Sequence, residues 1–279
     1  MNDHDLLLSE IRYGSEATLV FKGCELRCVW CERPELRVPA REILFDIDNC
    51  VECGKCSKAC GVGMQKMRPV RIYDRGFCTR CGNCVPACPN KLLSVCGNYY
   101  TVDEVVSGLT SHGARSLTAL GGDPACRHEP LIALFEAAKR AGIVTRLETP
   151  ACFDASYAAR IAAVTDEFVF DLFDSDPVRF RENTRGDVEK IFENVKTLDS
   201  LGKPSALRIR IIPGVNVGTG FVRDAAKLYG SLKNCERVEF VPYRKGGAKA
   251  AKLIDIYRYP EYREPTEAEI AGFKEEFYK

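Results

Sequence analysis

The sequence predicts an α/β protein, a partial (β/α)6 barrel whose strand–helix order is interrupted near the amino terminus by a cysteine-rich insert. Six short apolar segments alternate with amphipathic helical segments, the order that a parallel sheet with helical crossovers requires. The chain has 15 cysteines among 279 residues, and most of them fall within residues 24–100. Without the insert, at residues 32–100, about 210 residues remain, fewer than the roughly 250 of an eight-fold barrel but enough for six strand–helix units.

The expected strands are short apolar runs bounded by glycine, proline or polar residues. They lie at 17–21, 116–120, 144–149, 167–173, 206–212 and 237–242. The expected helices have apolar residues at helical spacing, with turn or capping residues at their ends. They lie at 101–112, 130–141, 154–164, 188–201, 221–232 and 266–278. Asp187 can cap the helix that follows it, and Gly142 and Gly202 can end the helices that precede them.

Charge and cysteine content narrow the class of protein. A net charge of +1 gives no strong field to attract nucleic acid or a membrane surface, so neither is expected as a partner. Residues 1–10 are acidic and lack the features of a signal peptide, and no apolar run approaches membrane-spanning length. The cysteines are therefore expected to be reduced thiols in the cytoplasm, where cysteine clusters bind metal. Four cysteines outside the clusters are expected to be small, buried apolar residues: Cys96, Cys126, Cys152 and Cys235.

Three cysteines on one short loop, Cys24, Cys28 and Cys31, follow the first expected strand in the spacing C-x3-C-x2-C. Thiolates suit a soft metal centre. Structural zinc usually takes four ligands in two spaced pairs, so zinc is the weaker interpretation of this loop. A [4Fe–4S] cluster closed by protein takes four cysteines, and three would leave one iron open to substrate. Trp30 lies between two of the cysteines and is expected to pack over the cluster, with peptide docking as the alternative.

The insert contains two similar cysteine runs with the spacing of bacterial ferredoxins that hold two [4Fe–4S] clusters. The runs are Cys50-x2-Cys53-x2-Cys56-x3-Cys60 and Cys78-x2-Cys81-x2-Cys84-x3-Cys88-Pro89. In that arrangement the fourth cysteine of each run binds the cluster of the other run. The expected ligands are Cys50, Cys53, Cys56 and Cys88 for cluster one, and Cys60, Cys78, Cys81 and Cys84 for cluster two. Zinc ribbons, the alternative, need four-cysteine sets with a long middle spacer.

The cysteine loop resembles that of the radical S-adenosylmethionine (radical SAM) enzymes. The resemblance implies that the open iron binds the amino and carboxylate groups of SAM, and that an electron from the cluster cleaves SAM to a 5′-deoxyadenosyl radical. After the second strand, Gly121, Gly122, Asp123 and Pro124 resemble the Gly-Gly-Glu-Pro motif that holds the methionine amino group. A plain loop turn is the alternative for these residues. The implied site lies at the carboxyl ends of the strands.

Further strand-end residues match cofactor-binding positions of the same enzymes. Arg208 is implied to contact the carboxylate of SAM, and Ile212 belongs to a segment implied to lie beside its adenine and ribose. Glu148, Thr149 and Asp171 match positions that hold a monovalent cation near that carboxylate. Solvated strand-end carboxylates are the alternative for the proposed cation site.

Together these motifs resemble the glycyl radical enzyme activating enzymes that carry a ferredoxin-like insert, a family that includes the pyruvate formate-lyase activating enzymes. The resemblance covers about residues 17–253. Three positions depart from it. Residues 13–17 lack the family's Asp-Gly-Pro-Gly turn, Phe173 replaces a lysine, and Arg244 replaces the histidine of a Pro-Tyr-His loop.

The resemblance implies a radical SAM core at residues 1–31 and 101–279 and a ferredoxin-like insert at 32–100. The implied cofactors are three [4Fe–4S] clusters, SAM and a monovalent cation. The implied reaction removes a hydrogen atom from a backbone glycine of a partner glycyl radical enzyme, with reduced flavodoxin or ferredoxin as electron donor. Two alternatives stay open: a radical SAM enzyme acting on a small molecule or peptide, and a ferredoxin-type electron-transfer protein on an inactive barrel.

Overall fold

A mostly parallel sheet forms the body of the protein in the computed structural model, which describes residues 5–62, 65–66, 72–73, 75–218 and 220–279. Six neighbouring strands run parallel and follow one another in chain order. They are β2 (Glu16–Phe21), β8 (Ser116–Gly121), β9 (Val144–Thr149), β10 (Glu167–Leu172), β11 (Ser205–Ile211) and β12 (Cys235–Pro242). The predicted parallel sheet of six strands is therefore confirmed.

Two antiparallel strands extend this sheet beyond β2. They are β1 (Leu6–Arg12), which pairs with β2, and β7 (Asn98–Tyr100), which pairs with β1. The full order is β12-β11-β10-β9-β8-β2-β1-β7. Neither added strand was expected from the sequence, and β7 lies inside the range predicted as the insert. The chain therefore returns to the main sheet at Asn98.

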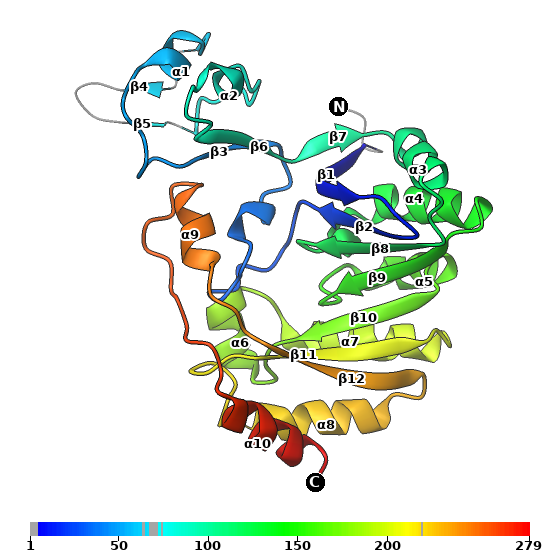
Figure 1. Cartoon of the computed structure of the whole chain (residues 1–279). Coiled ribbons are helices and arrows are strands. Elements are labelled where there is room, and N and C mark those ends of the chain that lie inside the picture. Colours follow the sequence, from blue (N-terminus) through cyan, green and yellow to red (C-terminus); the bar gives the residue numbers. More distant parts are fainter. Residues whose placement is uncertain (1–4, 63–64, 67–71, 74, 219) are drawn as a thin grey trace.

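Helices cover one face of the sheet (Figure 1). In Figure 1 the carboxyl ends of the parallel strands point away from α3 and α4. The main helices are α3 (Val102–Ser111), α4 (His128–Arg140), α5 (Ala158–Val164), α7 (Val188–Ser200), α8 (Phe221–Ser231) and α10 (Glu267–Phe277). Their apolar faces and the inner face of the sheet form one core that includes Leu19, Phe135 and Phe170. The Asp187 side chain accepts hydrogen bonds from the first turn of α7, as predicted.

Shorter helical segments lie between the main elements. They are η1 (Pro34–Leu36), η2 (Pro124–Arg127), η3 (Ala155–Tyr157), α6 (Pro177–Thr184) and α9 (Gly247–Lys252). The helix predicted at 154–164 is interrupted, because its first turn is η3 and the α-helix begins only at Ala158. Helices α6 and α9 were not expected. None of the helices in the described part of the chain has both the length and the apolar character needed to cross a membrane.

The insert forms a separate lobe beside the edge of the sheet that β7 forms (Figure 1). Its base is an antiparallel pair, β3 (Glu42–Phe45) and β6 (Leu93–Cys96). The lobe also contains α1 (Lys55–Lys58), α2 (Cys84–Ala87) and the short pair β4 (Gln65–Lys66) and β5 (Ile72–Tyr73). Residues 1–4 of the segment assessed for targeting signals, and residues 63–64, 67–71 and 74 of the predicted insert, lie outside the described residues.

Candidate active site

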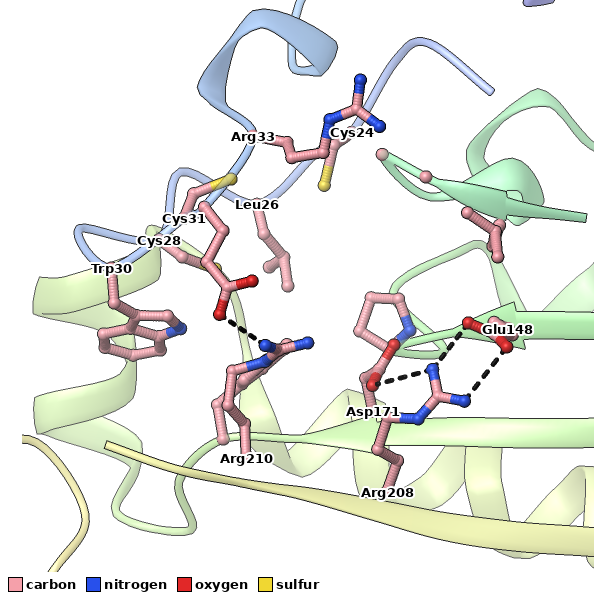
Figure 2. Close-up of a pocket in the computed structure, with 16 residues that line it drawn as sticks. Cys24, Leu26, Cys28, Trp30, Cys31, Arg33, Glu148, Asp171, Arg208 and Arg210 are labelled. Carbon is pink, nitrogen blue, oxygen red and sulfur yellow. Dashed lines mark hydrogen bonds and ion pairs between the residues drawn. The ribbon is translucent and has the colours of Figure 1, made fainter. Parts of the chain in front are cut away.

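One cavity of about 240 Å³ lies at the carboxyl ends of the parallel strands (Figure 2). The loop after β2 supplies one wall, and the ends of β8, β9, β10 and β11 supply the others. The polar and sulfur-bearing residues around it are Cys24, Cys28, Cys31, Glu32, Arg33, Glu148, Asp171, Arg208 and Arg210. The predicted site residues are up to almost two hundred positions apart in the sequence, and the fold brings most of them into one site.

The three cysteines of the loop after β2 all line this cavity. Two neighbouring segments hold the loop through its backbone. Gly23 N–H donates to Leu36 O at 2.7 Å in η1, and Arg27 N–H donates to Thr184 O at 2.7 Å at the end of α6. In Figure 2 the cysteines lie across the cavity from Glu148 and Arg208.

Burial has the largest effect on the pKa values of these thiols. It raises the pKa of Cys24, Cys28 and Cys31, and for Cys24 and Cys28 the neighbouring cysteines add to the increase. Within the described residues, no group of three or more His, Cys, Asp or Glu side chains is arranged to hold a metal ion. The chemistry of the donor set nevertheless fits an iron–sulfur cluster, because three thiols and no competing imidazole share one buried cavity.

The two glycines after β8 are required by close packing against the cysteine loop. Gly121 has φ of +126°, and a Cβ there would lie 2.5 Å from Phe21 O. A Cβ on Gly122 would lie 2.1 Å from Gly23 O. Both contacts are too short for any side chain. These glycines therefore let the end of β8 approach the backbone that leads directly into Cys24.

Asp123 is buried next to this contact, with 1% of its surface exposed. Its Oδ1 accepts hydrogen bonds from Ala125 N–H at 3.1 Å and from Thr149 Oγ1 at 2.7 Å. Its Oδ2 lies 3.4 Å from Cys126 Sγ, which donates to it. Burial raises the pKa of Asp123 to about 6, although these hydrogen bonds act in the opposite direction. Asp123 is thus both the cap of η2 and a buried anionic group close to the loop.

Arg208 is the centre of the charged wall of the cavity. Its guanidinium pairs with both carboxylate oxygens of Glu148, at 2.6 and 3.0 Å, and with Glu239 at 3.1 Å. Asp171 Oδ1 lies 3.9 Å from Arg208 Nη1. Burial alone would lower the pKa of Arg208, but the ion pair with Glu148 raises it above its ordinary value. Burial raises the pKa of Asp171, and Arg208 acts against that increase.

The residues predicted to hold a cation are therefore divided between two partners. Glu148 and Asp171 face Arg208, whereas Thr149 donates its hydroxyl proton to Asp123. Ile212, predicted beside SAM, is fully buried, and its N–H donates to Asn216 Oδ1 at 2.8 Å.

Several residues of this site were not identified from the sequence. Arg210 pairs with Glu32 at 2.5 Å, which joins the end of β11 to the residue after Cys31 (Figure 2). Trp30, by contrast, was expected from the sequence to pack over the cluster, and it is 2% exposed and lines the cavity, with its ring centroid 5.9 Å from that of Phe173. Strand-end arginines at alternate positions of β11 were a signal that could have identified Arg210 together with Arg208.

The cysteines of the insert form two groups in the lobe. A second, small cavity is lined by the four residues predicted for cluster one, namely Cys50, Cys53, Cys56 and Cys88. Burial raises the pKa of Cys84 to about 11, and Cys78 and Cys81 lie close enough to add to that increase. Cys60 lies in the turn after α1, where its N–H donates to Ser57 O at 3.2 Å.

The four isolated cysteines lie outside the lobe's two groups. Cys96 and Cys152 are buried, as predicted. Cys126 and Cys235 are only partly buried, so the prediction of full burial is wrong for these two. For Cys126 the reason is its position in η2, at the edge of the site beside Asp123.

Comparison with known proteins defines the class first. Residues 42–89 match the 4Fe-4S dicluster domain. Among solved structures, SuiB from Streptococcus suis bound to precursor peptide SuiA shares the fold, with a TM-score of 0.55 and 14% identity over 96% of this chain and 46% of that one. A radical SAM methyltransferase from Sphaerobacter thermophilus shares it with a TM-score of 0.50 and 13% identity over 65% of this chain and 55% of that one. The chain therefore shares its fold with these two proteins, and it carries a three-cysteine loop at the strand ends.

Curated relatives then define the family. The isethionate sulfite-lyase activating enzyme of Nitratidesulfovibrio vulgaris is 30% identical over 87% of this chain and 83% of its own length. The choline trimethylamine-lyase activating enzyme of Oleidesulfovibrio alaskensis is 28% identical over 88% of this chain and 84% of its own. The chain belongs to the glycyl radical enzyme activating enzymes.

Proposed function

We propose that this chain activates a partner glycyl radical enzyme by removing a hydrogen atom from one of its backbone glycines. The observation that carries the proposal is the shared cavity, in which three thiols of one loop face an arginine–carboxylate wall. A [4Fe–4S] cluster on that loop would supply the electron that cleaves SAM to methionine and the 5′-deoxyadenosyl radical that takes the hydrogen atom. Glycine suits such a site because, without a Cβ, its backbone can enter a narrow pocket in conformations closed to other residues.

The same proposal assigns the domains. Residues 1–31 and 101–279 form the radical SAM core, and residues 32–100 form the ferredoxin-like insert. Six parallel strands in chain order, followed in most cases by helices on one face, support a partial (β/α)6 barrel for the core. The dicluster match at residues 42–89 lies inside the proposed insert. The pairing of β7 with β1 places the last residues of the proposed insert, 98–100, on the core sheet.

We assign three [4Fe–4S] clusters to the chain. Cys24, Cys28 and Cys31 would hold the SAM cluster. The cavity shared by Cys50, Cys53, Cys56 and Cys88 supports the ligand set of insert cluster one. Cys78 and Cys81, which lie close enough to Cys84 to add to the increase in its pKa, support three of the four ligands of cluster two together with Cys84, and Cys60 would be the fourth. The insert clusters would receive electrons from a reduced flavodoxin or ferredoxin.

The charged residues would orient SAM within the cavity. Asp123, which is buried and donates its backbone N–H to Gly23 O beside the cysteine loop, would pair with the ammonium group, and Gly121 and Gly122 keep the backbone close to that loop. Arg208 would bind the carboxylate by exchanging part of its pairing with Glu148. The cation assigned to Glu148, Thr149 and Asp171 stays a prediction, since Arg208 already neutralises two of these residues.

The test is an anaerobic assay of the reconstituted protein with SAM, dithionite and candidate glycyl radical enzymes from the same genome. We expect 5′-deoxyadenosine together with a glycyl radical signal in the electron paramagnetic resonance (EPR) spectrum of the partner. Replacing Cys28 with alanine should abolish both. Formation of 5′-deoxyadenosine without a radical on any candidate partner would favour a small-molecule or peptide substrate. No cleavage of SAM by the reconstituted protein would favour electron transfer alone.

A further inference from the structure

Arg37 contacts all three cysteine residues of the loop after β2. Its backbone oxygen accepts a hydrogen bond from Cys24 N–H at 3.1 Å. Its guanidinium donates from Nη2 to Cys28 O, and its positive charge lies close enough to the Cys31 thiol to oppose the increase that burial causes in the pKa of that thiol. One residue, placed by the turn that ends η1, therefore reaches every residue that would hold the SAM cluster.

Tyr259 reaches the same loop from the carboxyl-terminal part of the chain. Its hydroxyl oxygen lies 3.0 Å from Cys31 O and 3.3 Å from Cys28 O, so its single proton can be donated to either carbonyl. Arg37 Nη2 donates to that hydroxyl at 2.5 Å. Gly247, the first residue of α9, is also tightly fitted between the loop and Tyr259, because a Cβ there would lie 2.3 Å from Cys31 O and 3.1 Å from the Tyr259 ring.

One donor of Arg37 has no partner. Its Nε is buried, and within the described part of the chain no acceptor lies within hydrogen-bond distance of it. A buried unpaired donor is costly, and a cationic one more so. An anionic sulfur acceptor on the cysteine loop would satisfy it, since the same guanidinium already donates to Cys28 O on that loop.

We propose that Arg37 and Tyr259 form a clamp that fixes the cysteine loop and raises the reduction potential of the cluster it holds. They are positioning residues, and the inference rests on the proposed function. Reduction adds negative charge to a cluster, so a nearby cation and donors directed at its ligands stabilise the reduced form more than the oxidised form. Arg37 supplies the charge and the donors, and Tyr259 holds the guanidinium in place.

The experiment is a redox titration of the anaerobic full-length protein, followed by the EPR signal that changes when SAM is added. That signal separates the SAM cluster from the insert clusters. Arg37→Gln removes the charge, and we expect the reduced fraction at a fixed potential to fall about ten-fold, a shift of about 59 mV for one electron. Tyr259→Phe should shift the potential in the same direction by less, and Arg37→Lys should restore part of it.

Two matched controls lie beside Tyr259. Arg258 is exposed, so Arg258→Gln removes the same charge without touching the loop. Tyr257 is 56% exposed and bonds Asp255, so Tyr257→Phe removes a hydroxyl that does not reach the loop. Both variants should keep the wild-type potential. An equal shift in Arg258→Gln would overturn the clamp in favour of a general charge effect.

The remaining outcomes separate the clamp from the proposed function. An unchanged potential in Arg37→Gln, with the SAM-sensitive signal intact, would overturn the clamp and leave the proposed function standing. Loss of the cluster in Arg37→Gln, with an unchanged potential in Tyr259→Phe and Arg37→Lys, would also overturn it, because Arg37 would then only support the loop. No SAM-sensitive signal in the wild-type protein would overturn both proposals.

Discussion

Asp123 combines almost complete burial with three hydrogen-bond donors directed at its carboxyl group. Burial favours the neutral form, whereas the donors from Ala125, Thr149 and Cys126 favour the ionised form, and burial dominates. A ligand ammonium arriving at such a carboxylate would meet a charge with little competing water. The residue can therefore contribute more to binding than an exposed aspartate would.

Replacing Asp123 with asparagine should weaken SAM binding by about ten-fold or more. The variant keeps the shape and the cap of η2 but loses a charge-assisted hydrogen bond worth roughly 1.5–3 kcal/mol, at about 1.4 kcal/mol per decade. Asp123→Glu, which restores the residue of the family motif, should be tolerated. SAM titration of the reconstituted proteins, observed in the cluster's absorption spectrum, gives the affinities.

The matched control is Asp154→Asn. Asp154 caps η3 by accepting from Ser156 N–H at 2.9 Å, as Asp123 accepts from Ala125 N–H, but it lies at the surface away from the cavity. This variant should bind SAM normally. Equal SAM affinities for the wild-type protein, Asp123→Asn and Asp154→Asn would mean that Asp123 only caps the turn.

The pKa of Asp123 also predicts how SAM binding depends on pH. With a pKa of about 6 in the folded protein, the carboxyl is ionised above pH 6 and protonated below it. Only the ionised form can pair with an ammonium group, so affinity should be constant above pH 6 and fall about ten-fold per unit below it. In Asp123→Asn this dependence should disappear. A wild-type affinity that is flat from pH 5 to 7 would contradict the assignment.

The raised pKa of Asp123 affects folding stability in the opposite direction: low pH weakens SAM binding but stabilises the folded protein. Because the pKa of Asp123 in the folded protein, about 6, exceeds its ordinary value of 3.8, the folded state binds the proton more tightly than the unfolded state. The contribution of Asp123 to stability is therefore complete below pH 3.8 and is lost as the pH rises to 6.

At the scale of elements, the strands and helices with strong local patterns could be predicted from the sequence. Strand β9 has the predicted bounds, and α7 begins after the cap that Asp187 supplies. Helix α6 was missed although Asp176 and Pro177 form a cap followed by a first-turn proline, because the rest of the helix is too polar to show a periodic apolar face. Strand β1 depends on pairing with β2 and β7, and β7 on pairing with β1, and no local pattern encodes these pairings.

In the candidate site too, some features could be predicted from the sequence and others depend on the tertiary fold. The three cysteine runs and the Gly-Gly-Asp-Pro turn are local motifs, so they could be selected as candidates from the sequence. The contact between Arg37 and Tyr259 joins residues 222 positions apart, and the pairing of Thr149 with Asp123 depends on how β8 and β9 lie together. Contacts of this kind arise from the tertiary fold, and a single sequence carries no signal for them.

The ferredoxin-like insert should assemble its clusters independently of the SAM cluster. Cys53 and Cys81 are exposed, so changing either to alanine creates no core cavity. The wild-type protein should contain about twelve irons, four per cluster, and each variant about eight. SAM cleavage with dithionite should persist in both variants, because the loop of Cys24 shares no ligand with the insert.

Iron analysis and Mössbauer spectroscopy measure the loss, and Cys235→Ala is the control. Cys235 lies at the start of β12, outside every proposed ligand set, and should keep all the iron. A folded Cys53→Ala protein without any cluster would show that the three sites do not assemble independently.

For the whole molecule, the attachment of the insert to the core matters because the proposed function requires electrons to pass between them. Lys22, the residue before Gly23 and Cys24, is completely buried and donates to Glu42 of β3 at 2.6 Å and to Glu35 O at 2.5 Å. The start of the cysteine loop and the base of the insert are therefore joined by one ion pair. A buried lysine without this carboxylate would be strongly destabilising.

A second attachment joins the insert to the segment after α9. Arg75 donates to Asp255 at 2.7 Å, to Leu253 O at 2.8 Å and to Ile43 O at 2.7 Å. Both side chains of the Arg75–Asp255 pair are only 24% exposed. Nearby, Lys252 pairs with Asp48 at 3.2 Å, but these side chains are 50% and 63% exposed. The two pairs bridge the same parts of the chain and differ mainly in burial.

This difference predicts the result of two double-mutant cycles, measured as melting temperatures of the reconstituted protein. For Arg75→Ala and Asp255→Asn, where asparagine suits the left-handed backbone of Asp255, we expect a coupling energy of about 1 kcal/mol, or about 2–4 °C. Arg75→Ala alone should cost more than Asp255→Asn, because it also releases two carbonyl groups. For Lys252→Ala and Asp48→Asn the coupling should be near zero, since solvent screens an exposed pair. Equal couplings in the two cycles would show that the half-buried pair does not hold the insert to the core.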